Sequence, residues 1–252
     1  MSDNPKIIAV VQARVGSSRL PSKVLEPVFQ DVSILEIVLE KVISVVGTNK
    51  TVLATTAESN DDSVAALGNA LGVMVIRGST ENVLSRFQSA VQKIGATGCL
   101  RICADNPLIL SDELKHLIEI WIEKPVDYLS FGIDGMPTIK SHIGLWAEMI
   151  RAQTLLDLAE MPLSKSDKEH VTQYIYNNPE KFNVKIESLT NLPETLVNAR
   201  LTVDTLQDLL NVKCLINELG KASPSLNEIE QALTNNPFLQ RSMLGEIRQN
   251  TK

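Results

Sequence analysis

Cysteine and histidine are scarce in this sequence. The 252 residues include three cysteines, Cys99, Cys103 and Cys214, and three histidines. The number of cysteines is odd and their spacing matches no zinc-binding pattern, which argues against a disulfide framework and a structural zinc site. We expect all three thiols to be reduced, as in a cytoplasmic protein.

Long apolar runs and a surplus of positive charge are missing as well. No run approaches the roughly 20 apolar residues of a membrane-spanning helix, and the opening residues, MSDNPK, lack the pattern of a signal peptide. The net charge is −6, so the basic surface of a protein that binds duplex nucleic acid is absent. We therefore expect neither a membrane nor a nucleic acid as partner, and any anion must be bound by a local cluster.

The sequence does contain an alternation of apolar runs with helical patterns. Short runs that are typical of buried strands occur at residues 7–11, 51–56, 73–76 and 99–103. A stretch with helical spacing follows each of them, beginning with residues 34–46. This order predicts an α/β fold with a mainly parallel sheet and helices on both faces.

The alternation loosens after residue 125, where the elements are less regular. We expect strands at residues 128–131, 182–187 and 199–203, and helices at residues 145–160, 167–177, 206–219, 225–234 and 237–249. Because no linker-like stretch interrupts the chain, residues 1–252 are predicted to form a single domain. Residues 132–198 are interpreted as an insertion into it.

A basic loop follows the first predicted strand. It contains Arg14, Arg19 and Lys23 but matches neither the dinucleotide-binding glycine pattern nor the Walker phosphate loop. Gly16 allows close approach of the backbone to a ligand, Ser17 offers a hydroxyl group, and the arginines can bind phosphate oxygens bidentately. The composition suits a polyphosphate, and an ordinary solvated loop is the alternative.

Two aspartates follow predicted strands. Asp105 comes after residues 99–103 and Asp204 after residues 199–203. Because ligands of such sheets bind beyond the carboxyl ends of the strands, both side chains could reach one metal ion. A turn at Asp105 and a helix cap at Asp204 would use the same residue type, so the pattern leaves these alternatives open.

Six segments in order resemble the signatures of the cytidylyltransferase family. They are QARVGSSRLPSKVL, TVLATTAESNDD, VIRGSTENVLSRF, RICADNPLI, KEHVTQYIY and RLTVDTLQDL, and the matches extend to about residue 210. The family includes the CMP-Kdo and CMP-sialic acid synthetases, and the spore-coat polysaccharide biosynthesis (SpsF-type) branch in particular. The resemblance implies a Rossmann-like three-layer sandwich of the nucleotide-diphospho-sugar transferase type.

The activity that the resemblance implies is transfer of CMP from CTP to a sugar acid, with release of pyrophosphate. It implies Mg²⁺ as cofactor, a Kdo-like or nonulosonic acid as acceptor, a role in surface polysaccharide biosynthesis, and a homodimer built through the insertion. A nucleotide-sugar glycosyltransferase is an alternative, although no D-x-D motif is present. The second alternative is a nucleotide-binding protein without catalytic activity.

The resemblance also assigns roles to individual residues. Catalysis is assigned to Arg14, Lys23 and Asp105, and metal binding to Asp105 and Asp204. The predicted nucleotide-binding residues are Gln12, Ala13, Arg14, Gly16, Ser17, Arg19, Lys23, Thr55, Arg77, Gly78, Ser79 and Arg86. The predicted acceptor-binding residues are Glu148, His170 and Arg200, of which His170 could equally be a packing residue and Arg200 a charge at a strand end.

Three positions depart from the family pattern. Ala104 stands for a glycine, Asn106 for a cysteine and Trp146 for an aspartate. All three lie on the predicted acceptor side. We therefore expect an unusual acceptor or a weakened activity, with CTP binding retained.

Overall fold

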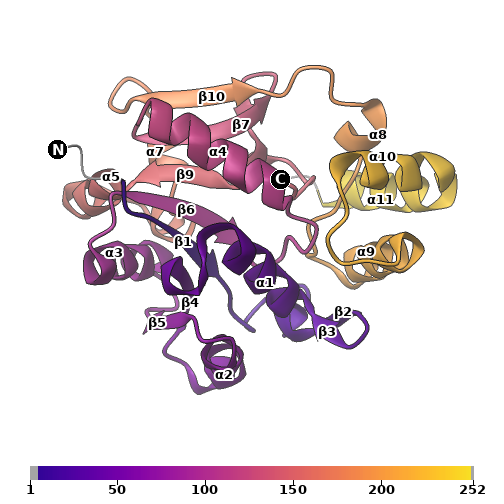
Figure 1. The fold of residues 1–252 in the computed structure, drawn as a ribbon, viewed down its shortest axis with the longest axis horizontal. Coiled ribbons are helices and arrows are strands. Elements are labelled where there is room, and N and C mark those ends of the chain that lie inside the picture. The colour runs from indigo at the N-terminus through magenta and orange to yellow at the C-terminus, as the bar shows by residue number, and fades with distance from the viewer. Residues whose placement is uncertain (1–4, 251–252) are drawn as a thin grey trace.

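The computed structural model describes residues 5–250, and a mixed eight-stranded sheet forms its centre (Figure 1). The strands are β1 (Ile7–Gln12), β4 (Thr51–Thr56), β5 (Met74–Gly78), β6 (Gly98–Cys103), β7 (Tyr128–Ile133), β8 (Met136–Pro137), β9 (Glu148–Arg151) and β10 (Val184–Ser188). Their order is β10-β7-β9-β6-β1-β4-β5, with β8 beside β7. Strands β1, β4, β5 and β6 pair in parallel, whereas β9 runs antiparallel to both β6 and β7.

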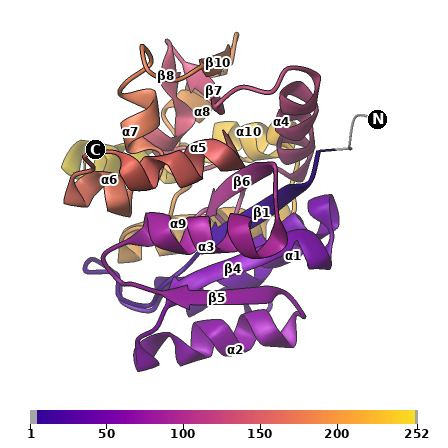
Figure 2. The same cartoon turned by 90° about the vertical axis from the view of Figure 1, so that its left-hand side faces the viewer.

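Helices cover both faces of this sheet, so that the molecule has three layers (Figures 1 and 2). Helices α1 (Ile34–Val46) and α4 (Ser111–Glu123) pack on one face, and α3 (Val83–Ile94) and α5 (Ala152–Asp157) on the other. The side chains of β1 alternate between the two cores: Ala9 and Val11 join the first, Ile8 and Val10 the second. All four are fully buried, which confirms the predicted strand with two apolar faces.

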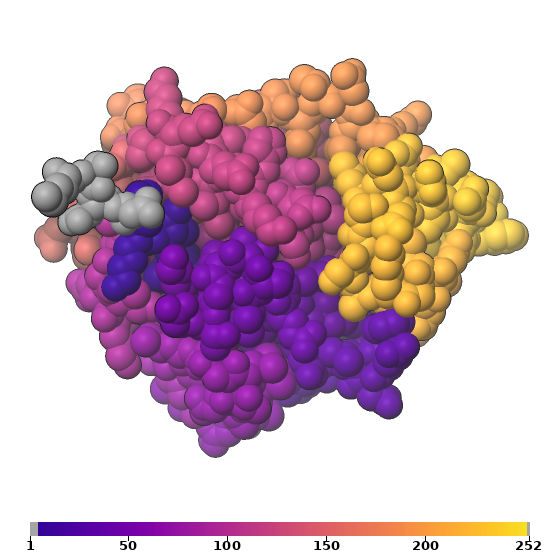
Figure 3. Space-filling model, in the orientation of Figure 1, coloured from indigo at the N-terminus to yellow at the C-terminus, as the bar shows by residue number. Residues whose placement is uncertain are grey.

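The C-terminal helices lie at one end of the sheet. They are α9 (Leu206–Leu219), α10 (Leu226–Asn235) and α11 (Pro237–Gln249), and both α10 and α11 pack against α9. The space-filling view shows them as one lobe (Figure 3). The N-cap residue of α9 is Thr205, whose side chain forms a capping box with Asp208. None of the helices in residues 5–250 is long and apolar enough to cross a membrane.

The predicted helix at residues 145–160 is wrong in its first half. Residues Glu148–Arg151 form strand β9, and only Ala152–Asp157 and the 3-10 turn Leu158–Glu160 are helical. Glu148, Met149 and Ile150 are buried between two neighbouring strands. Pairing on both sides therefore overrides the local helical spacing, which is a weak determinant by itself.

Two further predicted elements differ. Residues 199–203 form no strand, because Leu201 N–H bonds to His142 O (3.0 Å) and Val203 N–H bonds to Asp105 O (2.8 Å). The segment is thus tied to two loops. The predicted helix at residues 167–177 is broken into α6 (Lys165–Glu169) and α7 (Gln173–Tyr176), with Val171 between them at a φ of 43°.

Lys41 on α1 is a buried lysine that donates to two backbone carbonyls. Its Nζ lies 2.8 Å from Pro107 O and 3.2 Å from Ile109 O, and the residue is 4% exposed. Burial lowers the pKa of the Lys41 amine to about 7. A neutral amine has two N–H groups, which match the two carbonyls, whereas the ammonium form carries a third.

We expect Lys41 to make stability depend on pH. Between pH 7 and about 10 the unfolded chain holds a proton on this amine that the folded protein lacks, so the contribution of Lys41 to stability rises with pH there. Below pH 7 the Lys41 amine is protonated in both the folded and the unfolded protein. Its contribution to stability then no longer changes with pH and stays at its least favourable value. The test is to measure the free energy of unfolding in urea for the wild type and for Lys41→Met. The value for the wild type minus that for the variant should rise between pH 7 and 9, by at most about 1.4 kcal/mol per pH unit. Exposed Lys50, changed to Met, is the control; equal slopes for wild type and Lys41→Met would contradict the expectation.

Candidate active site

A cavity of about 720 Å³ opens beyond the carboxyl ends of β1 and β6, and its size is typical of small-molecule sites. The predicted site residues that line it are Gln12, Ala13, Arg14, Ser17, Arg19, Lys23, Arg86, Asp105, His170 and Asp204. Those that do not line it are Gly16, Thr55, Arg77, Gly78, Ser79, Glu148 and Arg200. The cavity thus collects the charged groups of the basic loop and the two aspartates.

Lys23 lies at the centre of this group. Its Nζ donates to Asp105 Oδ2 (3.0 Å), to Asp204 Oδ1 (2.9 Å) and to Val203 O (2.6 Å). Burial alone would lower the pKa of the amine, but the charges of both aspartates and its hydrogen bonds to them raise that pKa above its ordinary value. Lys23 is therefore a fixed cation that holds two carboxylates distant in sequence.

Asp204 is the more buried of the two aspartates. Its side chain is 8% exposed, against 27% for Asp105. Arg19 NH2 lies 3.1 Å from Asp204 Oδ1, the oxygen that also accepts from Lys23. Two cations of the basic loop thus converge on one carboxylate oxygen.

Arg14 is paired across the cavity. Its NH2 lies 3.2 Å from Glu169 Oε1, and its NH1 donates to Thr80 O (3.4 Å). The two side chains of this ion pair are 36% and 43% exposed, so the pair contributes little to stability and can be displaced. Glu169 is a cavity residue that sequence reasoning missed, although it lies within the quoted segment KEHVTQYIY.

Arg86 on α3 brings another cation to the wall. It is 2% exposed, its NH1 donates to Ala54 O (3.3 Å), and its Nε has no hydrogen-bond partner among the described residues. Burial and the nearby charge of Arg14 lower the pKa of Arg86 to about 10, so it stays charged at neutral pH. Gly78 accommodates it, because a Cβ at this glycine would lie 3.0 Å from Arg86 Cγ.

The other predicted nucleotide-binding residues are placed outside the cavity. The guanidinium group of Arg77 is bound to Thr56 O (2.8 Å), Glu58 O (2.7 Å) and Asp62 Oδ1 (2.6 Å), and so fixes the turn after β4. Thr55 is fully buried. Gly16 lines a separate hollow next to the basic loop.

Glu148 lies behind the cavity wall. It is 1% exposed and accepts from Tyr128 OH (2.5 Å), from Thr172 Oγ1 (2.9 Å) and from Arg101 NH1. Arg101 itself lines the cavity and donates from Nε to Gln12 Oε1 (3.2 Å). The structure therefore places Arg101, which was not predicted, between Glu148 and any ligand.

Arg200 also lies away from the cavity. Its side chain is fully buried, and its Nε and NH2 donate to the two carboxylate oxygens of Asp208 at 2.7 and 3.0 Å. The predicted contact of Arg200 with an acceptor does not fit this position, because its bidentate partner is already present. His170, by contrast, does line the cavity.

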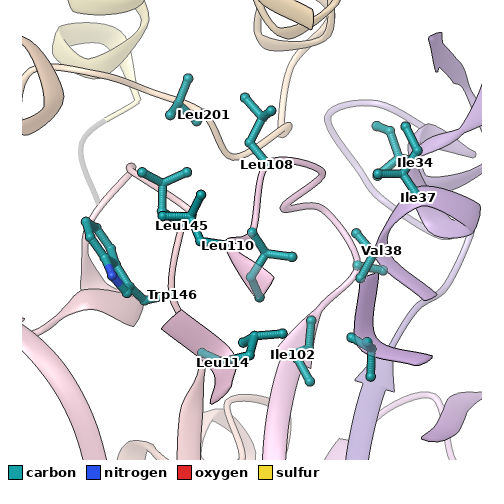
Figure 4. Close-up of a cluster of buried hydrophobic side chains, with 14 of the residues drawn as sticks. Ile34, Ile37, Val38, Ile102, Leu108, Leu110, Leu114, Leu145, Trp146 and Leu201 are labelled. Atoms are coloured by element: carbon teal, nitrogen blue, oxygen red, sulfur yellow. The ribbon is translucent and has the colours of Figure 1, made fainter. Parts of the chain in front are cut away.

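The departures from the family pattern lie at the cavity as well. Ala104, Asn106 and Trp146 all line it, and Trp146 is also part of the apolar cluster with Leu145 (Figure 4). Asn106 Oδ1 and Trp146 Nε1 are buried without a hydrogen-bond partner among the described residues. Gly144, at a φ of 66°, has no room for a side chain, because a Cβ would lie 2.8 Å from Asn106 Oδ1.

Asp105 and Asp204 are the residues that could hold a divalent cation. Within residues 5–250 there is no group of three or more histidine, cysteine or acidic side chains that could bind a metal by itself. Mg²⁺ needs only one or two carboxylates when substrate phosphates and water complete its shell. The two aspartates therefore fit an ion that is shared with a bound polyphosphate.

Known sequences are similar to this chain over nearly its whole length. A sequence model described as cytidylyltransferase matches residues 8–247. An uncharacterized protein of Methanocaldococcus jannaschii is 33% identical over 246 residues, which cover 97% of this chain and 96% of that protein. The spore coat polysaccharide biosynthesis protein SpsF of Bacillus subtilis is 30% identical over 239 residues, 92% of this chain and 95% of its own length.

Solved structures show the same fold. A cytidylyltransferase from Leptospira borgpetersenii superposes with a TM-score of 0.83 at 26% identity, over 93% of this chain and 96% of that one. A CMP:2-keto-3-deoxy-manno-octonic acid synthetase complexed with CTP gives a TM-score of 0.63 at 16% identity, over 85% and 99%, and supports the fold alone. The predicted α/β fold is confirmed. The chain belongs to the cytidylyltransferase family and is a nucleotidyltransferase.

Proposed function

We propose that this protein is an Mg²⁺-dependent cytidylyltransferase that transfers CMP from CTP to a sugar acid in the biosynthesis of a surface polysaccharide. The observation that carries the proposal is the convergence of Lys23, Asp105 and Asp204 in the cavity. The similarity to the Bacillus subtilis SpsF protein supports the link to polysaccharides. Membership of the cytidylyltransferase family supports CTP as donor.

The residues of this chain would stabilise the charges of the reaction. Arg14, Arg19 and Arg86 line the cavity and would neutralise the triphosphate before reaction. When the acceptor oxygen attacks the α-phosphate, negative charge grows on the leaving pyrophosphate. Lys23, a cation already fixed in place, would stabilise that charge without reorganisation.

Asp105 and Asp204 would hold Mg²⁺ together with the phosphates of CTP. The ion would supply charge neutralisation at the phosphate oxygens. Because Lys23 now binds both carboxylates, nucleotide and cation would take over part of its contacts.

The cavity also offers groups that suit an acidic acceptor. Arg101, Lys140 and His170 line it, together with the aromatic side chains of Trp146 and Tyr176. The charges of Arg101 and Lys140 would attract a carboxylate, and aromatic faces would pack on a sugar ring. We place the enzyme in the cytoplasm, in keeping with the small and odd number of cysteines in its sequence, and as a homodimer formed through residues 132–198.

The direct test is release of pyrophosphate from CTP with a panel of Kdo and nonulosonic acids, with Mg²⁺ or with EDTA. We expect pyrophosphate and a CMP-linked sugar, detected by mass spectrometry, with one acceptor and only with the metal. Hydrolysis of UDP-sugars without CTP turnover would instead support a glycosyltransferase. Binding of CTP without turnover on any acceptor would support a silent nucleotide-binding protein.

Glu169 is expected to weaken CTP binding in the native protein. Its carboxylate is paired with the guanidinium group of Arg14 and would compete with the phosphates for that group. Changing Glu169 to Gln keeps the shape of the side chain and removes its charge. A half-exposed ion pair is worth about 0.2–1 kcal/mol, so calorimetry should show CTP binding about 1.4- to 5-fold tighter. Glu180→Gln, at an exposed position, is the control. Weaker binding by Glu169→Gln would mean that this carboxylate is needed in the nucleotide complex.

A further inference from the structure

Arg200 is a buried arginine that joins three segments of the chain. Its Nε and NH2 bind Asp208 (2.7 and 3.0 Å), its NH2 also lies 3.4 Å from Asp204 Oδ2, and its NH1 lies 2.6 Å from His142 Nδ1. The side chain has no exposed surface. An arginine in this position cannot serve a ligand directly, so its role must be exerted through the groups that it holds.

Asp208 anchors the arginine and the backbone of Asp204 together. It is fully buried, and its carboxylate accepts from Arg200, from the N–H of Asp204 (2.9 Å) and from the N–H of Thr205 (2.9 Å). It also lies in the first turn of α9, where the helix dipole favours a negative charge. The pair is bidentate and desolvated, which makes it geometrically specific.

The consequence is that Asp204 is held from two sides. Its Oδ2 faces Arg200, whereas its Oδ1 accepts from Lys23 (2.9 Å) and lies 3.1 Å from Arg19 NH2. The carboxylate therefore presents one defined oxygen to the cations of the cavity. Without Arg200, the carboxylate would lose its anchor at Oδ2 and could turn away from Lys23.

His142 connects the same arginine to another wall of the cavity. Arginine remains protonated, so Nδ1 of His142 accepts from it and the ring proton is on Nε2. The carbonyl of His142 accepts from Leu201 N–H (3.0 Å) and Thr202 N–H (3.3 Å). On either side of His142, residues 138–141 and Gly144 line the cavity.

We propose that Arg200, anchored by Asp208, is a positioning residue that orients Asp204 toward Lys23 and, through His142, fixes the wall at residues 138–144 relative to that carboxylate. The proposal rests on the proposed function, because Asp204 and Lys23 act there on the triphosphate. Displacement by about 1 Å of a group that acts in the transition state can cost about 10²-fold in rate. The arginines that would neutralise the triphosphate, Arg14, Arg19 and Arg86, are not held by Arg200, so binding of CTP should change little.

Two histidine variants test the proposal. His142→Leu removes the acceptor for Arg200, whereas His142→Asn places an amide oxygen where Nδ1 lies. We expect His142→Leu to lower kcat at least tenfold with less than a threefold change in the calorimetric Kd for CTP, and His142→Asn to recover most of kcat. Exposed His116 on α4, changed to Leu, is the control. Arg200→Lys, with its folding checked by thermal unfolding, should lower kcat further.

The outcomes separate the two proposals. If the wild type does not turn over CTP with any acceptor, the proposed function fails, and crystal structures still decide the positioning role. Asp204 turned away from Lys23 in His142→Leu or Arg200→Lys, but not in His142→Asn, would support it. The proposal would be overturned if Asp204 kept its position in both His142→Leu and Arg200→Lys. It would also be overturned if the wild type were active and His142→Leu had the same kcat.

Discussion

Replacing Lys23 with methionine is expected to lower the rate of CMP transfer by about 10²- to 10³-fold, the usual effect of removing one fixed group that stabilises transition-state charge. Methionine keeps the apolar stem of the side chain but removes the ammonium that binds Asp105, Asp204 and Val203 O. The two carboxylates then lose their common counter-ion. The loss should appear in kcat as well as in kcat/KM, because the cation acts on the charge that forms on pyrophosphate.

Arginine at the same position should not restore the rate. A planar guanidinium group presents its N–H donors in a fixed fork, whereas the three acceptors of Lys23 surround one nitrogen. Pyrophosphate release under saturating CTP measures both variants, and Lys50→Met serves as the control because Lys50 is exposed outside the cavity. A Lys23→Met enzyme that works at the wild-type rate would show that Lys23 only keeps the aspartates in place.

Because the neighbouring carboxylates raise the pKa of Lys23, its charge persists at alkaline pH. We therefore expect no fall in activity from deprotonation of this amine between pH 7 and 9. An NMR titration in which the Lys23 amine loses its proton between pH 7 and 9 would contradict this expectation. The charged state of Lys23 is thus a property of its position between two acids.

The central strands could be predicted from sequence because their residue types by themselves indicate buried strands. Ile8, Ala9, Val10 and Val11 are apolar and largely β-branched, and strands of that kind are stable where both faces are covered. The basic loop follows directly from β1, so the topology alone brings it to the edge of the sheet where ligands bind.

The approach of Asp204 to Asp105 was predicted for a partly wrong reason. We expected two parallel strands to bring them together, but residues 199–203 form no strand. The contact between Val203 N–H and Asp105 O (2.8 Å) and the shared ammonium of Lys23 bring the aspartates together instead. Hydrogen bonds between two loops, such as this one, cannot be predicted from the spacing of residues along the chain.

The burial of charged side chains could not be predicted either. Glu148 was predicted at the acceptor from the family resemblance, and Arg200 because its charge could hold the carboxylate of an acid substrate. Each is instead held by a partner that is distant or unmarked in sequence, Asp208 for Arg200 and Arg101 for Glu148. The pairing of Arg101 with Glu148 depends on the register of β6 and β9, in which these two residues lie opposite each other and which is set by tertiary packing.

Changing Arg101 to methionine is expected to lower the free energy of unfolding by about 3–5 kcal/mol, because it would leave Glu148 as a buried charge without a counter-ion. The two side chains are 4% and 2% exposed. Tyr128 and Thr172 would still donate to the carboxylate, but two hydroxyl groups do not neutralise it. Urea unfolding of the variant and the wild type at neutral pH measures the loss.

The double variant Arg101→Met with Glu148→Gln identifies the cause. If the uncompensated charge is what destabilises the single variant, neutralising Glu148 should recover more than half of the loss, and the double-mutant cycle should give a large coupling energy. Arg151→Met is the matched control, because the Arg151–Asp127 pair is partly exposed at 38% and 26% and should cost at most about 1 kcal/mol. An Arg101→Met variant that is no less stable than Arg151→Met would contradict the expectation.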